Sequence, residues 1–179
     1  MAVTRLLTSD DAPALAELLR SNRVFLAPWQ PLRSASFFTL EGQQEDVAQA
    51  LVQHQAGNSV PFVIDDGTQL VGTITVQSII RGAFQSCSVG YWLAEDAQGQ
   101  GLATQALREA VHLAFHELHL HRVQAETLVR NLRLQRVLDR LGFARYGLAP
   151  AYLKIATGRW RDNLLYQLLT PAPQFQGVE

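Results

Sequence analysis

The chain has 179 residues, of which 47% are hydrophobic and 17% charged, and its formal net charge at pH 7 is -1. This composition is typical of one globular domain and excludes a disordered or fibrous chain. There is no basic run for nucleic acid or an anionic membrane, and no apolar run approaches the ~20 residues that span a bilayer. Cys87 is the only cysteine and no signal-peptide pattern precedes it, so we expect a cytoplasmic protein without nucleic-acid or membrane partners.

The first part of the chain predicts one strand, two helices and a proline-interrupted connection. Thr8-Ser9-Asp10-Asp11 supplies helix-capping and acidic residues, after which leucines recur at helical spacing. Pro28 and Pro31 interrupt the next stretch, and Gly57-Asn58 is typical of a helix end. In chain order we expect a strand at 3–7, a helix ending near 21–22, a loop or broken helix at 24–40 and a helix at 41–55.

The rest of the chain predicts strands separated by two helices. Asp65-Asp66-Gly67 indicates a hairpin turn, and the residues after Gly101 carry an apolar helical stripe as far as Leu118. Gly142 is expected to cap a later helix at its C-terminus. In chain order we expect strands at 60–64, 70–79 and 86–93, a helix from 102 to 118, a strand at 122–128, a helix at 131–141, and strands at 152–155 and 160–169.

This order of elements predicts one α/β (α+β) domain at 1–170, with a mixed sheet of about seven strands flanked by about four helices. A short tail at 171–179 follows, with two prolines and few apolar residues. The oligomeric state stays open between a monomer and a homodimer.

The segment with the clearest chemistry is Gln98-Gly99-Gln100-Gly101, between a predicted strand and a predicted helix. Such a loop presents backbone N–H groups at a positive helix N-terminus, where they bind phosphate. A tight strand-to-helix turn is the alternative. A dinucleotide-binding fingerprint is excluded because Thr104 stands where its third glycine would be, and no Lys-Ser or Lys-Thr completes a P-loop.

Gln98-Gly99-Gln100-Gly101-Leu102-Ala103 also fits the Gln/Arg-x-x-Gly-x-Gly/Ala pattern of the GNAT acetyltransferases, which this chain resembles. His121-Arg122-Val123 opens the next strand, and Asn131 precedes a helix that ends in Leu141-Gly142-Phe143, as in that superfamily. The RimJ/RimL-type branch is the most similar one. Four segments of this chain resemble that branch: Asn22 to Trp29, Arg81-Gly82-Ala83-Phe84, Tyr152 to Ile155 and Gly158 to Asp162.

The resemblance implies a single-domain GNAT fold and an acetyl-CoA-dependent N-acetyltransferase. The pantetheine arm of the cofactor would pair with strand 86–93 at Trp92 and Leu93, and the Leu93 N–H would stabilise the oxyanion. Asn131 and Leu134 would contact the same arm. The pyrophosphate would lie on the backbone of Gln98, Gly99, Gln100, Gly101, Leu102, Ala103 and Thr104.

Three positions depart from the RimJ/RimL pattern. Leu134 replaces a common serine acid, Ser88 replaces a common glutamate, and Asn163 replaces a common histidine. Catalysis then rests on proximity and the oxyanion site, or on substitutes. Glu126 would remove a proton through water, and Tyr152, or else Tyr91, would serve as acid. The alternatives are a solvated carboxylate for Glu126 and hairpin packing for Tyr152.

Phe25, Trp29 and Trp160 are candidates for the wall of the acceptor site, with core packing as the alternative. No metal is expected: His112 and His116 have suitable spacing, but solvated helix histidines are the better interpretation. Cys87 lacks a nucleophile motif and is expected to be buried and inert.

The acceptor amine stays open. A protein N-terminus or peptide is the first hypothesis, and a small amine is the second. The third is a non-catalytic acyl-CoA-binding protein, suggested by Leu134 and Ser88. A catalytic chain is expected to transfer the acetyl group directly in a ternary complex.

Overall fold

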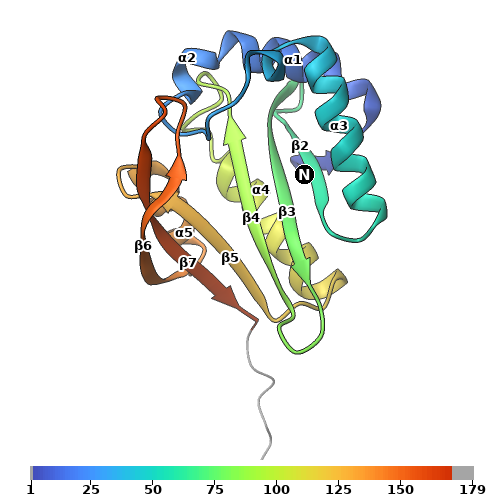
Figure 1. Ribbon diagram of the computed structural model, residues 1–179. Helices are drawn as coiled ribbons and strands as arrows, with labels where there is room; N and C mark the ends of the chain where they lie inside the picture. The colour runs from blue at the N-terminus through green and yellow to red at the C-terminus, as the bar shows by residue number, and fades with distance from the viewer. Residues whose placement is uncertain (1, 171–179) are drawn as a thin grey trace, which may run out of the picture.

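The computed structural model describes residues 2–170, and the tail expected at 171–179 lies outside the described residues. A seven-stranded sheet has the order β1-β2-β3-β4-β5-β7-β6, with helices on both of its faces (Figure 1). The strands are β1 (Thr4–Leu6), β2 (Val60–Asp65), β3 (Leu70–Ile80), β4 (Ser86–Leu93), β5 (Arg122–Leu128), β6 (Ala144–Lys154) and β7 (Trp160–Leu169). The helices are α1 (Ala12–Ser21), α2 (Arg23–Leu26), α3 (Leu40–Gln55), α4 (Leu102–His112) and α5 (Leu132–Arg140). Single turns complete the list: η1 (Ser9–Asp11), η2 (Ala35–Phe38) and the π-turn η3 (Leu113–Glu117).

The predicted order of elements and the mixed sheet are confirmed. β4 and β5 have the predicted bounds, and the helix expected after Gly101 runs as α4 and continues in η3. The fifth α-helix is the four-residue α2, which lies in the stretch expected to be a broken helix. Among residues 2–170, no helix is long and apolar enough to cross a membrane.

One strand was predicted wrongly: β6 begins at Ala144, eight residues before the expected start at Tyr152. Its pairing with β7 shifts register between Arg145 and Gly147 and again between Ala149 and Leu153. These irregularities break the period-2 alternation that marks a strand in sequence, and Pro150 lies inside the second one. A proline is tolerated there because β6 is an edge strand.

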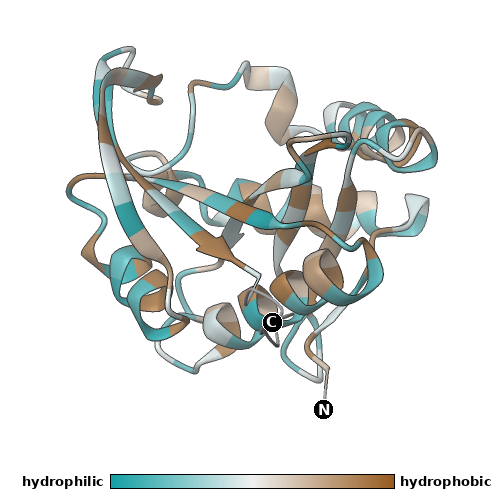
Figure 2. Cartoon of the chain, turned by 90° about the horizontal axis from the view of Figure 1, so that it is seen from below, coloured by the Kyte–Doolittle hydropathy of each residue, from teal (hydrophilic) through white to brown (hydrophobic). Residues whose placement is uncertain are grey.

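Two apolar layers hold the helices to the sheet. On one face, Ala106 and Leu107 of α4 and Leu138 of α5 pack in a cluster with buried residues of β2 to β5 and β7. On the other face, Leu15 of α1 and Val47 of α3 pack on β2. Seen from below, the helices carry hydrophobic and hydrophilic residues on different sides (Figure 2), as amphipathic helices must in such a three-layer arrangement.

The sheet divides between β4 and β5. These parallel strands are paired only from Ser86 to Ser88 on β4 and from Arg122 to Gln124 on β5. Beyond that point they diverge, which the ribbon shows clearly (Figure 1). The C-terminal halves of β4 and β5 therefore border a gap in the middle of the sheet.

Candidate active site

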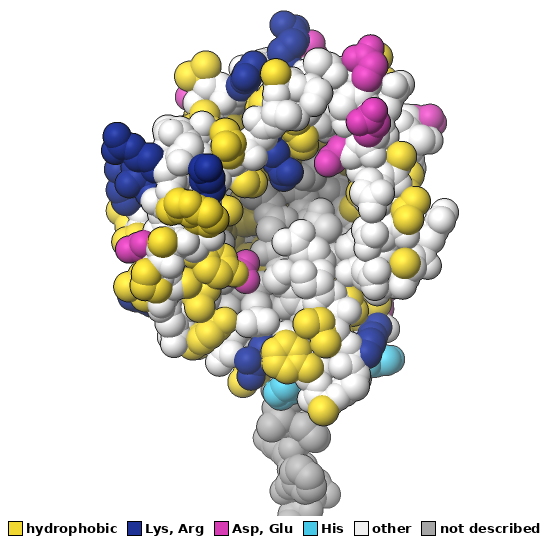
Figure 3. Space-filling model, in the orientation of Figure 1, with side chains coloured by type: hydrophobic (Ala, Val, Ile, Leu, Met, Phe, Trp, Pro, Cys, Tyr) yellow, Lys and Arg dark blue, Asp and Glu magenta, His cyan; other side chains and the backbone are white. Residues whose placement is uncertain are grey.

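The gap between β4 and β5 exposes backbone groups that an inner strand would normally pair. The amide of Ala94 donates to the Val71 carbonyl at 2.8 Å, toward β3. Successive peptide groups in a strand point to opposite edges, so the Leu93 N–H is directed toward the gap. This is the amide that the sequence predicts as the oxyanion donor. The space-filling view shows the face hollowed at its centre (Figure 3).

The loop after β4 has the backbone form of an anion site. Gly99 and Gly101 adopt φ of 78° and 83°, and a Cβ on either would meet no atom within 4 Å. Positive φ disfavours other residues, and the absence of side chains leaves the loop backbone facing open space. The side chain of Gln98 donates to the carbonyls of Leu93, at 3.1 Å, and Ala94, at 3.2 Å, which fixes the loop to the end of β4.

A cavity of about 430 Å³ joins this loop to α5. Arg133, Arg136 and Arg140 line it at i, i+3 and i+7 on one helical face. These three arginines were not predicted as site residues, although their helical spacing was a signal available in the sequence. Guanidinium groups opposite a glycine loop at the N-terminus of α4 fit the phosphates of coenzyme A in charge and in donor geometry.

The structure brings most of the predicted cofactor residues together in this cavity. Those that line it are Leu93, Gln98, Gly99, Gly101, Leu102, Ala103 and Thr104. Tyr91 also lines it. Trp92, by contrast, packs with the α1–α3 cluster, on the opposite face of the sheet. Gln100 is not part of the lining, and its side chain donates to the Asp96 carbonyl at 2.9 Å.

Asn131 and Leu134 lie at the start of α5, outside the lining of the cavity. The Asn131 side chain accepts the Leu134 N–H at 3.1 Å and is thus the N-cap of this helix. Leu134 is half-buried and packs against the main apolar cluster. Both side chains therefore stabilise α5: Asn131 caps the helix, and Leu134 packs against the apolar cluster.

Glu126 lies on the face of β5 opposite the apolar cluster that contains Val123 and Ala125. Burial raises the pKa of the Glu126 carboxyl above its ordinary value. Ser88, where the related pattern has glutamate, pairs with Gln124, two residues before Glu126 on the same face. The carboxylate that β4 lacks is therefore present on the neighbouring strand.

Tyr152, on β6, is 48% exposed. Partial burial raises the pKa of its phenol, and the negative charge of Glu126 raises that pKa further. Tyr91 differs: burial raises the pKa of its phenol strongly. Of the two predicted acids, Tyr152 is thus the one whose pKa responds to the charge of the candidate base.

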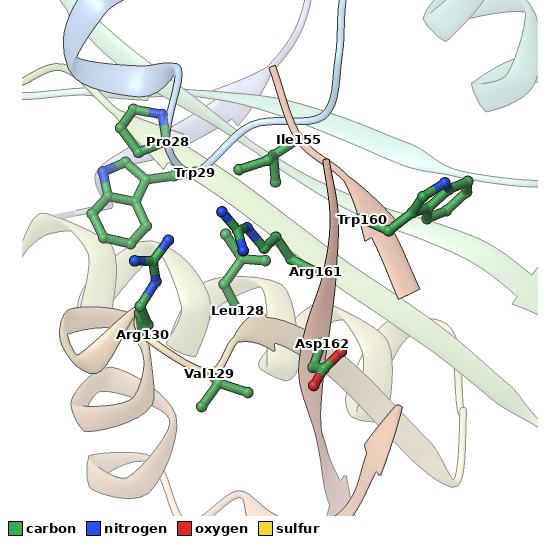
Figure 4. Close-up of a pocket in the computed structure, with 9 residues that line it drawn as sticks. All are labelled: Pro28, Trp29, Leu128, Val129, Arg130, Ile155, Trp160, Arg161 and Asp162. Carbon is green, nitrogen blue, oxygen red and sulfur yellow. The ribbon is translucent and has the colours of Figure 1, made fainter. Parts of the chain in front are cut away.

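A second cavity, of about 440 Å³, lies where β5 ends and β7 begins (Figure 4). It contains two of the residues expected to line the acceptor site, Trp29 and Trp160, and we propose it as the acceptor pocket, the name used below. Its lining residues are Pro28, Trp29, Leu128, Val129, Arg130, Ile155, Trp160, Arg161 and Asp162. Phe25 is not among them. The Trp29 ring stands beside the cavity, whereas the Trp160 ring points away from Trp29 (Figure 4).

Backbone contacts hold the loop of Trp29 against the β6–β7 hairpin. Pro31 forms an isolated bridge with Ile155, and the Leu32 N–H donates to the Lys154 carbonyl at 2.9 Å. The loop after β4 is also tied to this region, since the Glu95 N–H donates to the Asn22 side chain at 2.8 Å. The segment from Asn22 to Leu32 is therefore tied at its start to the loop after β4, through the Asn22 side chain, and at its end to the β6–β7 hairpin, through the backbone.

The side chains considered as a nucleophile or as metal ligands, Cys87, His112 and His116, are not arranged for either role. Cys87 is 1% exposed, and burial raises the pKa of its thiol to about 12, so it is protonated and inert at neutral pH. His112 and His116 stack with ring centroids 4.5 Å apart. Within residues 2–170, no three His, Cys, Asp or Glu residues are grouped to hold a metal ion.

A sheet that opens beside a glycine loop at a helix N-terminus, with arginines facing that loop, defines a protein that binds a phosphorylated cofactor with an extended arm. Residues 3–144 match the model of the acetyltransferase (GNAT) domain, and the chain belongs to this family. It is accordingly an acetyl-CoA-dependent N-acetyltransferase, as expected from the sequence.

Similar proteins agree with this assignment. The ribosomal protein uS5-alanine N-acetyltransferase of Escherichia coli (strain K12) is 35% identical, over 94% of this chain and 88% of that protein. The structure of the ribosomal-protein-S5-alanine acetyltransferase from Vibrio fischeri is 34% identical, with a TM-score of 0.88, covering 94% of this chain and 93% of that one. RimJ from Mycobacterium smegmatis, solved in complex with CoA-disulfide, is 29% identical with a TM-score of 0.89 and covers 93% of this chain and 81% of that one.

Proposed function

We propose that this enzyme acetylates the α-amino group of a protein N-terminus, in the cytoplasm, with an N-terminal alanine as the first acceptor to test. The observation that carries the proposal is the open acceptor pocket. Four separate segments contribute to it, and Trp29 on its wall is 40% exposed. An open site of this kind accommodates a chain that continues beyond the amine, whereas a small amine needs enclosure. Two similar proteins are named for a ribosomal-protein alanine acceptor.

In the proposed reaction, acetyl-CoA supplies an acetyl thioester, and the neutral amine forms an N–C bond as the C–S bond breaks. The Leu93 N–H, aimed at the gap, donates to the carbonyl oxygen while negative charge develops there. The backbone of the glycine loop and the three α5 arginines hold the phosphates. The enzyme thereby orients the two substrates in one ternary complex, without a covalent enzyme intermediate.

The amine proton leaves through water to Glu126, and the CoA thiolate is protonated by Tyr152 or by solvent. Glu126 suits this role because burial raises the pKa of its carboxyl toward the pKa of the amine whose proton it accepts. Leu134 has no proton to donate, and we assign it to packing beside the pantetheine arm. A free α-amino group has a pKa of about 7.7 to 8.0, so much of the acceptor is already neutral near pH 8.

The test is a thiol-release assay with acetyl-CoA and peptides that differ only in the first residue: Ala, Ser, Met or Pro. A matched peptide with a blocked N-terminus and a panel of small amines complete the set. We expect turnover with the Ala peptide, none with the blocked one, and mass spectrometry that places the acetyl group on the α-nitrogen. Turnover restricted to small amines would contradict the acceptor, and tight CoA binding without turnover would indicate a non-catalytic protein.

A further inference from the structure

The acceptor pocket carries two arginines that the reaction itself does not use. Arg130 and Arg161 line the pocket, and neither forms a salt bridge within residues 2–170. The Nε of Arg161 is buried and has no hydrogen-bond partner. Since that atom is closed to solvent, a ligand would be held by the terminal nitrogens of the two guanidinium groups, which point into the pocket (Figure 4).

The fold brings these two arginines to one pocket. Leu128 at the end of β5 faces Asn163 on β7, and the Val129 N–H donates to the Asp162 carbonyl at 3.3 Å. Arg130 lies in the turn just after β5, and Arg161 lies on β7 next to Asp162, so both line the same pocket. Both guanidinium groups point into the space beside Trp29 (Figure 4). Two positive charges that point into one space repel each other, and an anion between them removes this repulsion.

The acidic residue of the pocket does not neutralise this pair. Asp162 follows Arg161 on β7, so its side chain leaves the opposite face of the strand. Its carboxylate accepts the N–H of Ala151 at 2.8 Å, where Ala151 adopts a positive φ of 47° in the irregular part of β6. We therefore assign Asp162 to holding the strand pair and the arginines to binding.

The surroundings of the pocket have the same sign of charge. Lys154 and Arg159 are exposed at the tip of the β6–β7 hairpin. In the space-filling view, Lys and Arg side chains gather over this hairpin, while Asp and Glu side chains gather on the opposite rim, over the α1–α3 side (Figure 3). Such a field draws an acidic segment toward the hairpin side of the hollow.

We propose that the acceptor pocket binds the carboxylate of an Asp or Glu side chain close behind the N-terminal residue of the acceptor. Arg161 and Arg130 clamp the carboxylate, and the Trp29 ring packs on the methylene carbons of that side chain. The proposal rests on the proposed function and narrows its substrate class to acidic N-terminal segments. The arginines of the cofactor cavity are a separate set on α5, which leaves this pair free for the acceptor.

The experiment uses peptides that start with Ala and carry one Glu, moved through the positions that follow, each with a Gln twin. At one position we expect KM for the Glu peptide to be about tenfold below KM for its Gln twin. A tenfold difference corresponds to the free energy of one charge-assisted hydrogen bond. Arg161→Gln and Arg130→Gln should each remove this preference and leave KM for acetyl-CoA unchanged. Arg108→Gln, which removes a charge from an exposed position on α4, is the matched control and should keep the preference.

Binding of the acetylated product peptides, followed by tryptophan fluorescence, supplies a readout that needs no turnover, and thermal unfolding checks that each variant folds. Equal KM values for all Glu and Gln twins would overturn the carboxylate site. So would arginine variants whose KM rises for acetyl-CoA instead, since the pair would then belong to the cofactor. Charge-dependent binding without acetylation would keep the carboxylate site and contradict the proposed function. Equal competition by free acetate or phosphate would show a general anion site and overturn the assignment to a peptide side chain.

Discussion

The cofactor cavity and the acceptor pocket are built in different ways. One short segment, 97–104, and one face of α5 supply nearly all of the cofactor cavity, and much of its binding surface is backbone. The acceptor pocket takes residues from 28–29, 128–130, 155 and 160–162. Its chemistry resides in the side chains of Trp29, Arg130 and Arg161.

This difference predicts different responses to mutation. Backbone N–H groups do not change with residue type, so the loop of the cofactor cavity is sensitive mainly to changes in conformation, bulk or charge at its glycines, and its α5 face to loss of the arginines. Side chains from several segments are individually replaceable, so the acceptor pocket should change its preferences gradually. The cofactor cavity thus defines the reaction, and the acceptor pocket defines the substrate.

The largest effect is expected for Gly101→Asp. An aspartate adds bulk and negative charge where we place the pyrophosphate, at a residue with φ of 83°. Like charges in contact cost several kcal/mol, so CoA affinity should fall by at least about a hundredfold. Calorimetric titration of CoA measures this loss. Gly82→Asp is the matched control, because Gly82 has φ of 71° and equally open space at a distant turn. An equal loss in both variants would point to misfolding and contradict the phosphate site.

The same contrast explains what could be predicted from the sequence. The glycine loop was recognisable because its residues are contiguous and its conformation requires glycine at Gly99 and Gly101. β4 and β5 were placed correctly because apolar residues recur at every second position, at Val89, Tyr91 and Leu93 and at Val123 and Ala125. Arg130 and Arg161 were not predicted as partners, because only the fold brings the turn after β5 and the start of β7 to one pocket.

Two further features could not be predicted from local sequence patterns. The irregular pairing of β6 hid its first eight residues, since two register shifts interrupt the alternation. Phe25 was grouped with Trp29 because both stand in one proline-broken segment, yet only Trp29 lines the pocket. The direction in which a side chain points in such a segment depends on contacts with the β6–β7 hairpin. These contacts cannot be read from the sequence.

The next effect is expected for Glu126→Gln. Loss of the proton acceptor should lower kcat about tenfold near pH 7, less than for an obligatory general base, because roughly a tenth of the amine is already neutral at this pH. The difference should shrink as pH rises toward about 9, where the acceptor loses its proton unaided. A kcat profile over this range measures it. A deficit that stays constant with pH would argue against proton removal by Glu126.

The same variant should be more stable than the parent enzyme at neutral pH. The folded-state pKa of Glu126 is raised by burial, so its ionised form destabilises the fold. This penalty is absent below the unfolded-state pKa of about 4.3, grows as pH rises from there toward the folded-state pKa, and is complete above the folded-state pKa. Glu126→Gln should therefore raise Tm at pH 7, with the gain lost near pH 4. A variant that melts lower than the parent at pH 7 would contradict a desolvated carboxylate.

A smaller effect is expected for Trp29→Ala. The ring is 40% exposed on the wall of the acceptor pocket, so its removal should raise peptide KM about fivefold, or about 1 kcal/mol, with CoA affinity unchanged. Trp160→Ala is the comparison, since that ring is 59% exposed and points away, and its KM should change less. Unfolding of Trp29→Ala in a thermal melt would instead support a core role for the ring.

The smallest effect is expected for Leu134→Ser, which restores the serine common at this position in RimJ/RimL-type sequences. A serine hydroxyl near the thiolate would add an acid, whereas loss of the half-buried leucine removes apolar packing against the main cluster. CoA thiolate is a fairly good leaving group, so the acid is not essential, and turnover should be preserved or raised. Steady-state kcat, with Tm measured in parallel, separates the two contributions. A folded variant with turnover far below the parent would show that Leu134 itself positions the pantetheine arm. An isolable acetyl-enzyme on Cys87, or ping-pong kinetics in either protein, would overturn direct transfer.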